Sequence, residues 1–277
     1  MKFNEIYENS LVDAQKKYIE SSNFSTKPLM TTGIISPEST ICIQPVFGIK
    51  FELDKEGMSE VIEMFENIWN SRTEKEKKNL LSILSDVFSV TEEYLGGQGN
   101  LEKRENAYFK AKDNCLSLSE IKGKKIGLCA ERAAIGHQLL TILEKAGFIG
   151  EFESFFTRSH MTVDTFVPHA FIVLKNKKDS SKQYIFDIEN LIEYKKNDSS
   201  ELVPAIALYP LTEEEFEDFK EGKSLSPQCI HEQFGLSVVG PKRYYGDEIN
   251  YDDENYENEN QENNNPKVYV KKDNKDN

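Results

Sequence analysis

Helical spacing of apolar positions is the clearest pattern in the first part of the chain. The segments "DKEGMSEVIEMFENIWN" (54–70) and "TEKEKKNLLSILSDVF" (73–88) each carry one apolar stripe that repeats every three to four residues. Such stripes are the buried faces of amphipathic helices, so two helices are predicted here, with a weaker one over 4–20. The stripe positions are Val61, Met64, Phe65, Ile68 and Trp69 in the first helix, and Leu80, Leu81, Leu84 and Phe88 in the second.

A longer helix is predicted over 127–147, in "GLCAERAAIGHQLLTILEKAG". Its face is formed by Ala133, Gly136, Leu140 and Leu143, and Gly147 supplies a C-terminal stop. Cys129 then stands at or beside the first turn of this helix.

Strand patterns lie on both sides of the long helix. "GIISPESTICIQPVFGIKFEL" (33–53) is β-branched with Pro and Gly punctuation, which predicts two short strands. After the helix, strands are predicted within 148–156, 167–176 and 182–191, and the polar "KKDSS" (177–181) is the turn between the last two. A helix followed by an antiparallel meander indicates an α+β fold. We expect the helix that bears Cys129 to pack on this antiparallel sheet, with a helical region N-terminal to it.

Two further elements are predicted after the meander. "AIALYPLTEEEFEDFKEG" reads as a strand and then an acidic helix, in which Thr212 and Glu215 have the capping-box spacing. "LSVVGPKRYYG" (236–246) predicts the last strand.

The 277 residues are expected to form three regions. Residues 1–95 are predicted to be mostly helical, and 96–245 to form the core that contains the long helix and the meander. Composition marks the third region, 246–277, which is a tail rich in Asn, Asp and Glu. The tail has ten acidic residues, four lysines and almost no aliphatic residues, so it cannot bury enough surface to order itself and we predict that it is disordered.

Charge and segment composition exclude several classes of function. A formal charge of −14 argues against nucleic acid and against an anionic membrane surface as partners. The first 20 residues lack the apolar stretch of a signal peptide, and no run approaches 18 apolar residues. The cysteines, which form no C-x-x-C pair, are predicted to be reduced thiols in a cytoplasm, although secretion by a route without a signal stays open. They are Cys42, Cys115, Cys129 and Cys229.

Cys129 is the first candidate for chemistry. The unpaired N–H groups and the dipole of a helix N-terminus favour an anion, and the thiolate is the reactive form of a cysteine. The preceding "GKKIG" (123–127) allows close backbone approach and adds two lysines. A single cysteine at such a position is more often a buried structural residue than a nucleophile.

His169 and Asp187 supply the partners that a thiol nucleophile needs. His169 follows Pro168 at the start of one predicted strand, and Asp187 ends the next. With a hairpin centred near Lys178, the two residues stand directly opposite one another. An imidazole can take up and return protons while a carboxylate orients it, so the three residues form a candidate triad.

Other polar residues near this segment have structural interpretations. His137 lies about 80° round the helix from Cys129 and is predicted to be a surface or core-edge residue. His160 borders the expected cleft, Glu131 is expected in a structural salt bridge, and the set His160, His169 and Asp187 fits no common zinc spacing. We therefore predict neither cofactor nor metal.

At these residues the chain resembles the transglutaminase-like cysteine enzymes of the wider papain-like superfamily. The resemblance lies in "GLCAERA", "LLTILEKAGF", "PHAFIVL" and "YIFDIENL", and covers roughly 122–194. It implies that Cys129 is the nucleophile, His169 the base and Asp187 the orienting acid. The family often has Pro and then Thr or Asn after its Asp, whereas this chain has Ile188, Glu189 and Asn190.

The family also uses a Gln or an aromatic side chain upstream of its cysteine to help hold the oxyanion. Gln98, in "GGQGN" (96–100), is our candidate for that position, with the backbone N–H of Cys129 as the second donor.

The resulting hypothesis is a thiol-dependent amide hydrolase or acyltransferase, a cysteine peptidase or glutamine deamidase, that acts on a protein or peptide through an acyl-enzyme. The alternatives are a non-catalytic protein-binding module on the same scaffold and a zinc-dependent hydrolase.

Overall fold

The computed structural model describes residues 2–20, 27–44, 47–159, 169–195, 202–223 and 238–242. All of these residues belong to one compact unit, Met1–Gly246. The tail predicted over 246–277, together with His160 and Cys229, lies outside the described residues.

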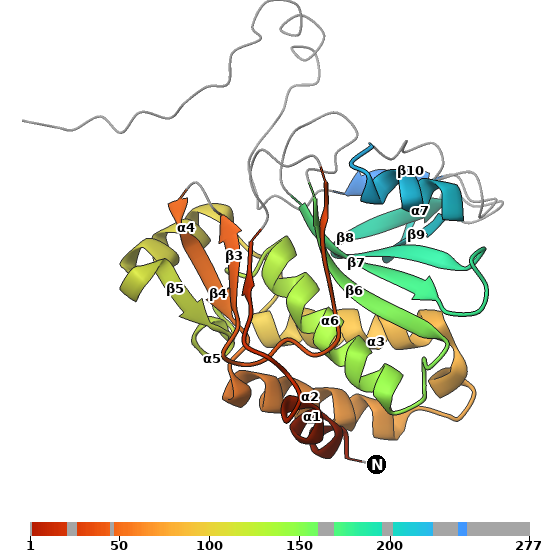
Figure 1. Ribbon diagram of the computed structural model, residues 1–277, viewed down its shortest axis with the longest axis horizontal. Helices are drawn as coiled ribbons and strands as arrows, with labels where there is room; N and C mark the ends of the chain where they lie inside the picture. The colour runs from red at the N-terminus through yellow and green to blue at the C-terminus, as the bar shows by residue number, and fades with distance from the viewer. Residues whose placement is uncertain are drawn as a thin grey trace, which may run out of the picture. The chain divides into compact units, whose positions relative to one another are not determined.

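The fold is α+β, as predicted, and its central element is the helix α6 (Cys129–Lys145). This helix packs on strands β6, β7 and β8 and against helices α1 and α3 (Figure 1). Every side chain from Ala130 to Leu143 is buried. The single buried face predicted from Ala133, Gly136, Leu140 and Leu143 was therefore too narrow, because α6 is covered on all sides rather than lying on a surface.

The six-stranded sheet is antiparallel and carries the predicted meander. Its order is β10-β8-β7-β6-β2, and β9 also pairs with β8. Its strands are β2 (Leu29–Thr32), β6 (Phe152–Ser159), β7 (His169–Asn176), β8 (Gln183–Lys195), β9 (Leu202–Leu211) and β10 (Val238–Lys242). The strand pattern of the sequence predicted all of these except β2.

A second sheet of four strands has the order β1-β3-β4-β5 and mixes parallel with antiparallel pairs. Its strands are β1 (Tyr18–Ile19), β3 (Thr40–Gln44), β4 (Ile49–Glu52) and β5 (Cys115–Ser117). The two strands predicted within 33–53 are β3 and β4. The region 1–95, predicted to be mostly helical, therefore contains the strands β1 to β4 as well as the helices α1, α2 and α3.

The remaining helices surround these sheets. They are α1 (Phe3–Leu11), α2 (Lys55–Ser71), α3 (Leu80–Leu95), α4 (Leu101–Lys110), α5 (Leu118–Ile121) and α7 (Glu213–Lys220), with short 3-10 turns at Glu76–Lys78 and Lys112–Asn114. Thr212 and Glu215 form the predicted capping box of α7. Leu81 is 53% exposed, against prediction, because the buried stripe of α3 follows Leu84, Val87 and Tyr94 instead.

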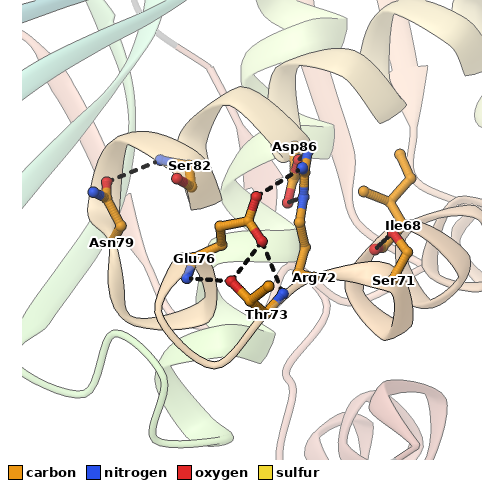
Figure 2. Close-up of polar contacts among 8 residues, drawn as sticks. All are labelled: Ile68, Ser71, Arg72, Thr73, Glu76, Asn79, Ser82 and Asp86. Carbon is orange, nitrogen blue, oxygen red and sulfur yellow. Dashed lines mark hydrogen bonds and ion pairs between the residues drawn. The ribbon is translucent and has the colours of Figure 1, made fainter.

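An ion pair fixes the connection between α2 and α3. Arg72, the C-cap residue that follows α2, donates from Nε to Asp86 Oδ2 at 3.0 Å, and its Nη2 contacts the other oxygen of this carboxylate (Figure 2). Asp86 is buried, so the guanidinium compensates a charge that would otherwise be costly there. Asn79 caps α3 by accepting from the N–H of Ser82.

Strand β7 is buried on both faces, which explains its nearly continuous apolar sequence. Ala170, Ile172 and Leu174 belong to the main core, which includes α6, whereas Phe171 and Val173 pack with residues of α7 in a second cluster. In the part of the chain that the structure describes, no helix combines the length and apolar character needed to cross a bilayer.

Candidate active site

Cys129 is the first residue of α6, as the sequence predicted. Its thiol is free and partly buried. Leu128, the residue before it, has extended backbone and donates its N–H to the Glu131 carboxylate at 3.3 Å. The chain therefore enters the helix in a fixed direction at Cys129.

A buried cluster of charges holds this helix start in place. Glu131, which is 0% exposed, accepts from Arg104 Nε at 2.8 Å, from Arg104 Nη2 at 3.3 Å and from the Tyr108 hydroxyl at 3.0 Å. Burial opposes the charge on Arg104, but the Glu131 carboxylate raises the pKa of this guanidinium above its usual value. The structural salt bridge predicted for Glu131 is confirmed, and its partners come from α4.

Arg132 joins the helix start to the glycine-rich loop after α3. Its Nη2 donates to the carbonyl of Gly97 at 2.7 Å, its Nε to the carbonyl of Gly127 at 3.1 Å, and its Nη1 contacts Glu92. Arg132 is only 2% exposed, so these contacts lie inside the protein. It fixes the loop that contains Gln98 against the segment that leads to Cys129.

His169 begins β7, and its imidazole meets two carboxylates. Its Nε2 lies 2.8 Å from Asp187 Oδ2, and its Nδ1 lies 3.7 Å from Glu189 Oε2. Burial lowers the pKa of His169, but the charge and hydrogen bond of Asp187, supported by Cys129, hold it well above its usual value. The Asp187 carboxylate is itself oriented, because its Oδ1 accepts from the backbone N–H of Glu189 at 3.1 Å.

Cys129 completes the group. Its Sγ, a ring nitrogen of His169 and a carboxylate oxygen of Glu189 all lie within 4.8 Å of one another. Since Asp187 occupies Nε2, Nδ1 is the ring nitrogen left for the thiol and for Glu189. The structure therefore brings together three of the four predicted site residues: Cys129, His169 and Asp187.

The register that predicted this arrangement was wrong by two residues. Ile172 pairs with Phe186 and Lys175 with Gln183, so opposed residues sum to 358 and the hairpin is centred on Asp179 rather than Lys178. Continued to the strand end, this register sets His169 opposite Glu189 and diagonal to Asp187. A shift of two keeps each side chain on its face, so His169 and Asp187 still meet.

Two more details of β8 differ from the prediction. Asp187 does not end the strand, which continues to Lys195 past an irregularity between Asp187 and Leu191. Glu189 lies within this irregular part, and burial raises the pKa of its carboxyl, as does the neighbouring Asp187. Glu189 is a site residue that the sequence argument named only as a departure from the family pattern.

Gln98 is exposed in the loop 96–100, and among the described residues its side chain makes no hydrogen bond to the other three. The loop itself lies against the segment before Cys129, since Asn100 donates its N–H to the carbonyl of Lys125 at 2.9 Å. Its role at an oxyanion stays a prediction.

His137 is fully buried, not at the surface or core edge as predicted. Its Nε2 lies 2.9 Å from the carbonyl of Gly33 and its Nδ1 2.8 Å from the hydroxyl of Ser154. Because a carbonyl can only accept, Nε2 carries the proton and Nδ1 accepts from Ser154. Burial lowers its pKa to about 4, so His137 is a neutral structural residue.

Arg158, near the end of β6, is a further charged residue that sequence reasoning missed. It is 4% exposed and donates to the carbonyls of Cys42 and Ile43 at the end of β3, which joins the two sheets. Burial lowers the pKa of this guanidinium, while the neighbouring Cys129 opposes that effect. Arg158 thus adds a fixed positive charge to the surroundings of Cys129.

Comparison of the chain with models of known families, with curated proteins and with solved structures found no match.

Proposed function

We propose that the protein is a thiol-dependent amide hydrolase or acyltransferase that uses Cys129, His169 and Asp187. The observation that carries the proposal is the convergence of a helix-start thiol, an imidazole within 4.8 Å of it, and a carboxylate 2.8 Å from the other ring nitrogen. A nucleophile, a base and an orienting acid in this order of contact are the parts of a catalytic triad.

In the proposed reaction the Cys129 thiolate attacks the carbonyl carbon of an amide. The C–N bond breaks, and the His169 imidazolium gives its Nδ1 proton to the departing nitrogen. Water then attacks the thioester, His169 takes its proton, and the C–S bond breaks to release the acid and the thiolate. Asp187 keeps Nδ1 directed at the sulfur throughout. A protein or peptide substrate would leave an amine, and a glutamine side chain would leave ammonia.

The backbone N–H of Cys129 is the expected donor to the oxyanion, with Gln98 as the second candidate. Within the described residues Cys42, Cys115 and Cys129 are all free, in keeping with the proposed cytoplasmic location.

The test is the alkylation rate of Cys129 by iodoacetamide at pH 6, read by mass spectrometry in the presence of EDTA. A free thiol of pKa about 8.5 is only about 0.3% thiolate at this pH. We expect Cys129 to react at least ~30-fold faster than such a thiol, and His169→Ala to remove most of that advantage, because the imidazolium would no longer stabilise the thiolate.

Cys115 is the internal control in the same spectra. Burial and Glu52 raise its pKa to about 11, so it should react slowly in the parent protein and equally slowly in His169→Ala. If Cys129 were alkylated no faster than Cys115, or if its alkylation rate were the same in His169→Ala as in the parent protein, the triad would not be assembled. The non-catalytic binding module would then be the better hypothesis.

A positive alkylation result would be followed by a substrate screen. Peptide cleavage and ammonia release from glutamine-bearing peptides separate the two proposed activities, and Cys129→Ala supplies the blank for each.

A further inference from the structure

The contact between His169 and Glu189 has no part in the proposed reaction. Glu189 Oε2 lies 3.7 Å from His169 Nδ1, too far for a hydrogen bond, and the Glu189 side chain is 25% exposed. The same carboxylate, the same imidazole and the Cys129 sulfur form a group of three within 4.8 Å. They come from β8, β7 and α6, so the fold assembles them from segments far apart in the sequence.

The donor set is that of a borderline-soft transition metal. A thiolate, an imidazole nitrogen and a carboxylate oxygen are all zinc ligands, whereas calcium and magnesium select oxygen alone. Ligand atoms of a tetrahedral zinc ion lie about 3.3–3.6 Å apart, given zinc bonds of about 2.0–2.3 Å. The His169–Glu189 separation is close to this value, and because the Cys129 sulfur lies within 4.8 Å of both atoms, it needs a movement of at most about 1 Å.

The hydrogen bonds that the candidate ligands make to neighbouring residues are also those found around bound metal ions. A metal-binding histidine usually donates its other ring N–H to a carboxylate, which fixes the tautomer and the ring orientation. His169 has this partner in Asp187, 2.8 Å from Nε2. Asp187 is held in turn by the N–H of Glu189, so the outer hydrogen bonds link two of the three ligands.

We propose that Cys129 Sγ, His169 Nδ1 and Glu189 bind one Zn²⁺ ion, with the fourth position open to water. Zinc binding uses the sulfur lone pair and the ring nitrogen that the proposed reaction needs. The ion therefore switches the nucleophile off reversibly. This consequence rests on the proposed function, whereas the binding of zinc does not.

The experiment is a competition titration of the full chain with Zn²⁺ against a chromophoric chelator at pH 7.5, repeated with Co²⁺ to detect a thiolate-to-cobalt charge-transfer band. We expect one ion per chain. Cys129→Ser should weaken zinc binding about 100-fold or more and abolish the cobalt band. Glu189→Gln and Asp187→Asn should each weaken binding about 10- to 100-fold, as a ligand and as the partner of a ligand.

Cys115→Ser is the matched control, because Cys115 lies on β5 and belongs to no such group in the described part of the chain. It should bind zinc as the parent protein does. Far-ultraviolet circular dichroism of each variant checks that the fold is retained, and Glu189→Gln, which keeps the size of the side chain, serves if Cys129→Ser does not fold.

No bound zinc at concentrations up to about 100 µM, or binding that is unchanged in both Cys129→Ser and Glu189→Gln, would overturn the proposal. Protection of Cys129 from iodoacetamide by one equivalent of zinc, reversed by EDTA, would support it. A different result would contradict the proposed function. In that case Cys129 would be alkylated slowly in EDTA, and its rate would not change in His169→Ala.

Discussion

Buried charges around Cys129 are arranged so that each has a partner. Glu131 has no exposed surface, and an unpaired carboxylate there would cost several kcal/mol. Arg104 and Tyr108 compensate it, and the N–H of Leu128 donates to Oε2, the oxygen that Arg104 Nη2 also contacts. The same carboxylate thus caps the helix and anchors α4, which makes the position of Cys129 depend on side chains some 25 residues earlier in the chain.

His137 makes the stability of the fold depend on pH. Its pKa in the folded protein is about 4 because of burial, whereas an unfolded histidine titrates near 6.5. The unfolded chain therefore binds an extra proton between these values, and stability falls as pH decreases from about 6.5 to 4. The loss should reach about 3 kcal/mol.

Urea unfolding at several pH values between 7 and 4 checks this expectation, with His137→Gln as the comparison. In His137→Gln the unfolding free energy should be lower at pH 7, and it should lose the part of its decrease between pH 6.5 and 4 that is due to His137. His169 acts in the opposite sense, because its raised pKa favours the folded state most fully below pH 6.5, so the difference between the two proteins isolates His137. Parallel pH curves would contradict the assignment.

The positions of Cys129 and His169 at the start of a helix and of a strand were predictable from the sequence. The buried arginines that hold the surrounding elements together were not. Cys129 stands where Gly127 and the following apolar period place a helix start, and His169 follows a proline that begins a strand. Arg104 and Arg158 contact residues 27 and 115–116 positions away, and nothing local distinguishes them from exposed arginines. Pairing between distant segments is decided by packing, which a local pattern does not contain.

At the scale of elements, the β7–β8 hairpin shows how a turn sets the site. Asn176 Oδ1 accepts from the N–H groups of Lys178 and Asp179, and Asp179 Oδ1 accepts from Ser181. These local bonds centre the turn on Asp179, one residue later than the polar composition of "KKDSS" suggested. The recognition of Asn and Asp as turn-forming side chains is the signal that could have given the register and, with it, Glu189.

The segment 123–128 is held against the glycine-rich loop by close backbone contact. A Cβ on Gly99 would stand 2.2 Å from the carbonyl oxygen of Gly127, which is backbone and cannot move aside. We expect Gly99→Ala to cost about 1–3 kcal/mol in unfolding free energy. It should also slow the alkylation of Cys129, because the displaced segment leads directly into that residue.

Gly150→Ala is the matched control for this substitution. Its Cβ would meet its nearest neighbour at 3.7 Å, an ordinary contact, so stability should change by less than about 0.5 kcal/mol. Denaturant unfolding and iodoacetamide kinetics measure both variants. Equal effects of the two substitutions would show that the approach of Gly99 to Gly127 does not support the site.

At the scale of the whole molecule, the predicted regions 1–95 and 96–245 share one hydrophobic core. The main cluster contains Phe65 and Trp69 of α2 together with Leu140 of α6 and Ile172 of β7. Trp69 packs edge-on against Phe148, with ring centroids 4.6 Å apart. An interface of this kind resembles the interior of one domain rather than a contact between two.

We therefore expect residues 1–95 and 96–245 to unfold together. Trp69 is the only tryptophan, so its fluorescence reports on α2, while hydrogen exchange of the β7 amides reports on the meander. In urea both probes should give one midpoint, and Phe148→Ala should lower the stability measured by each by about 2–3 kcal/mol. If Trp69 fluorescence changed at lower urea than β7 protection, or Phe148→Ala affected the Trp69 probe alone, the region before residue 96 would be a separate folding unit. In that case the helix that carries Cys129 could keep its triad while α2 and α3 are unfolded, and the proposed active site would depend on α6 and on strands β6 to β10 of the six-stranded sheet alone.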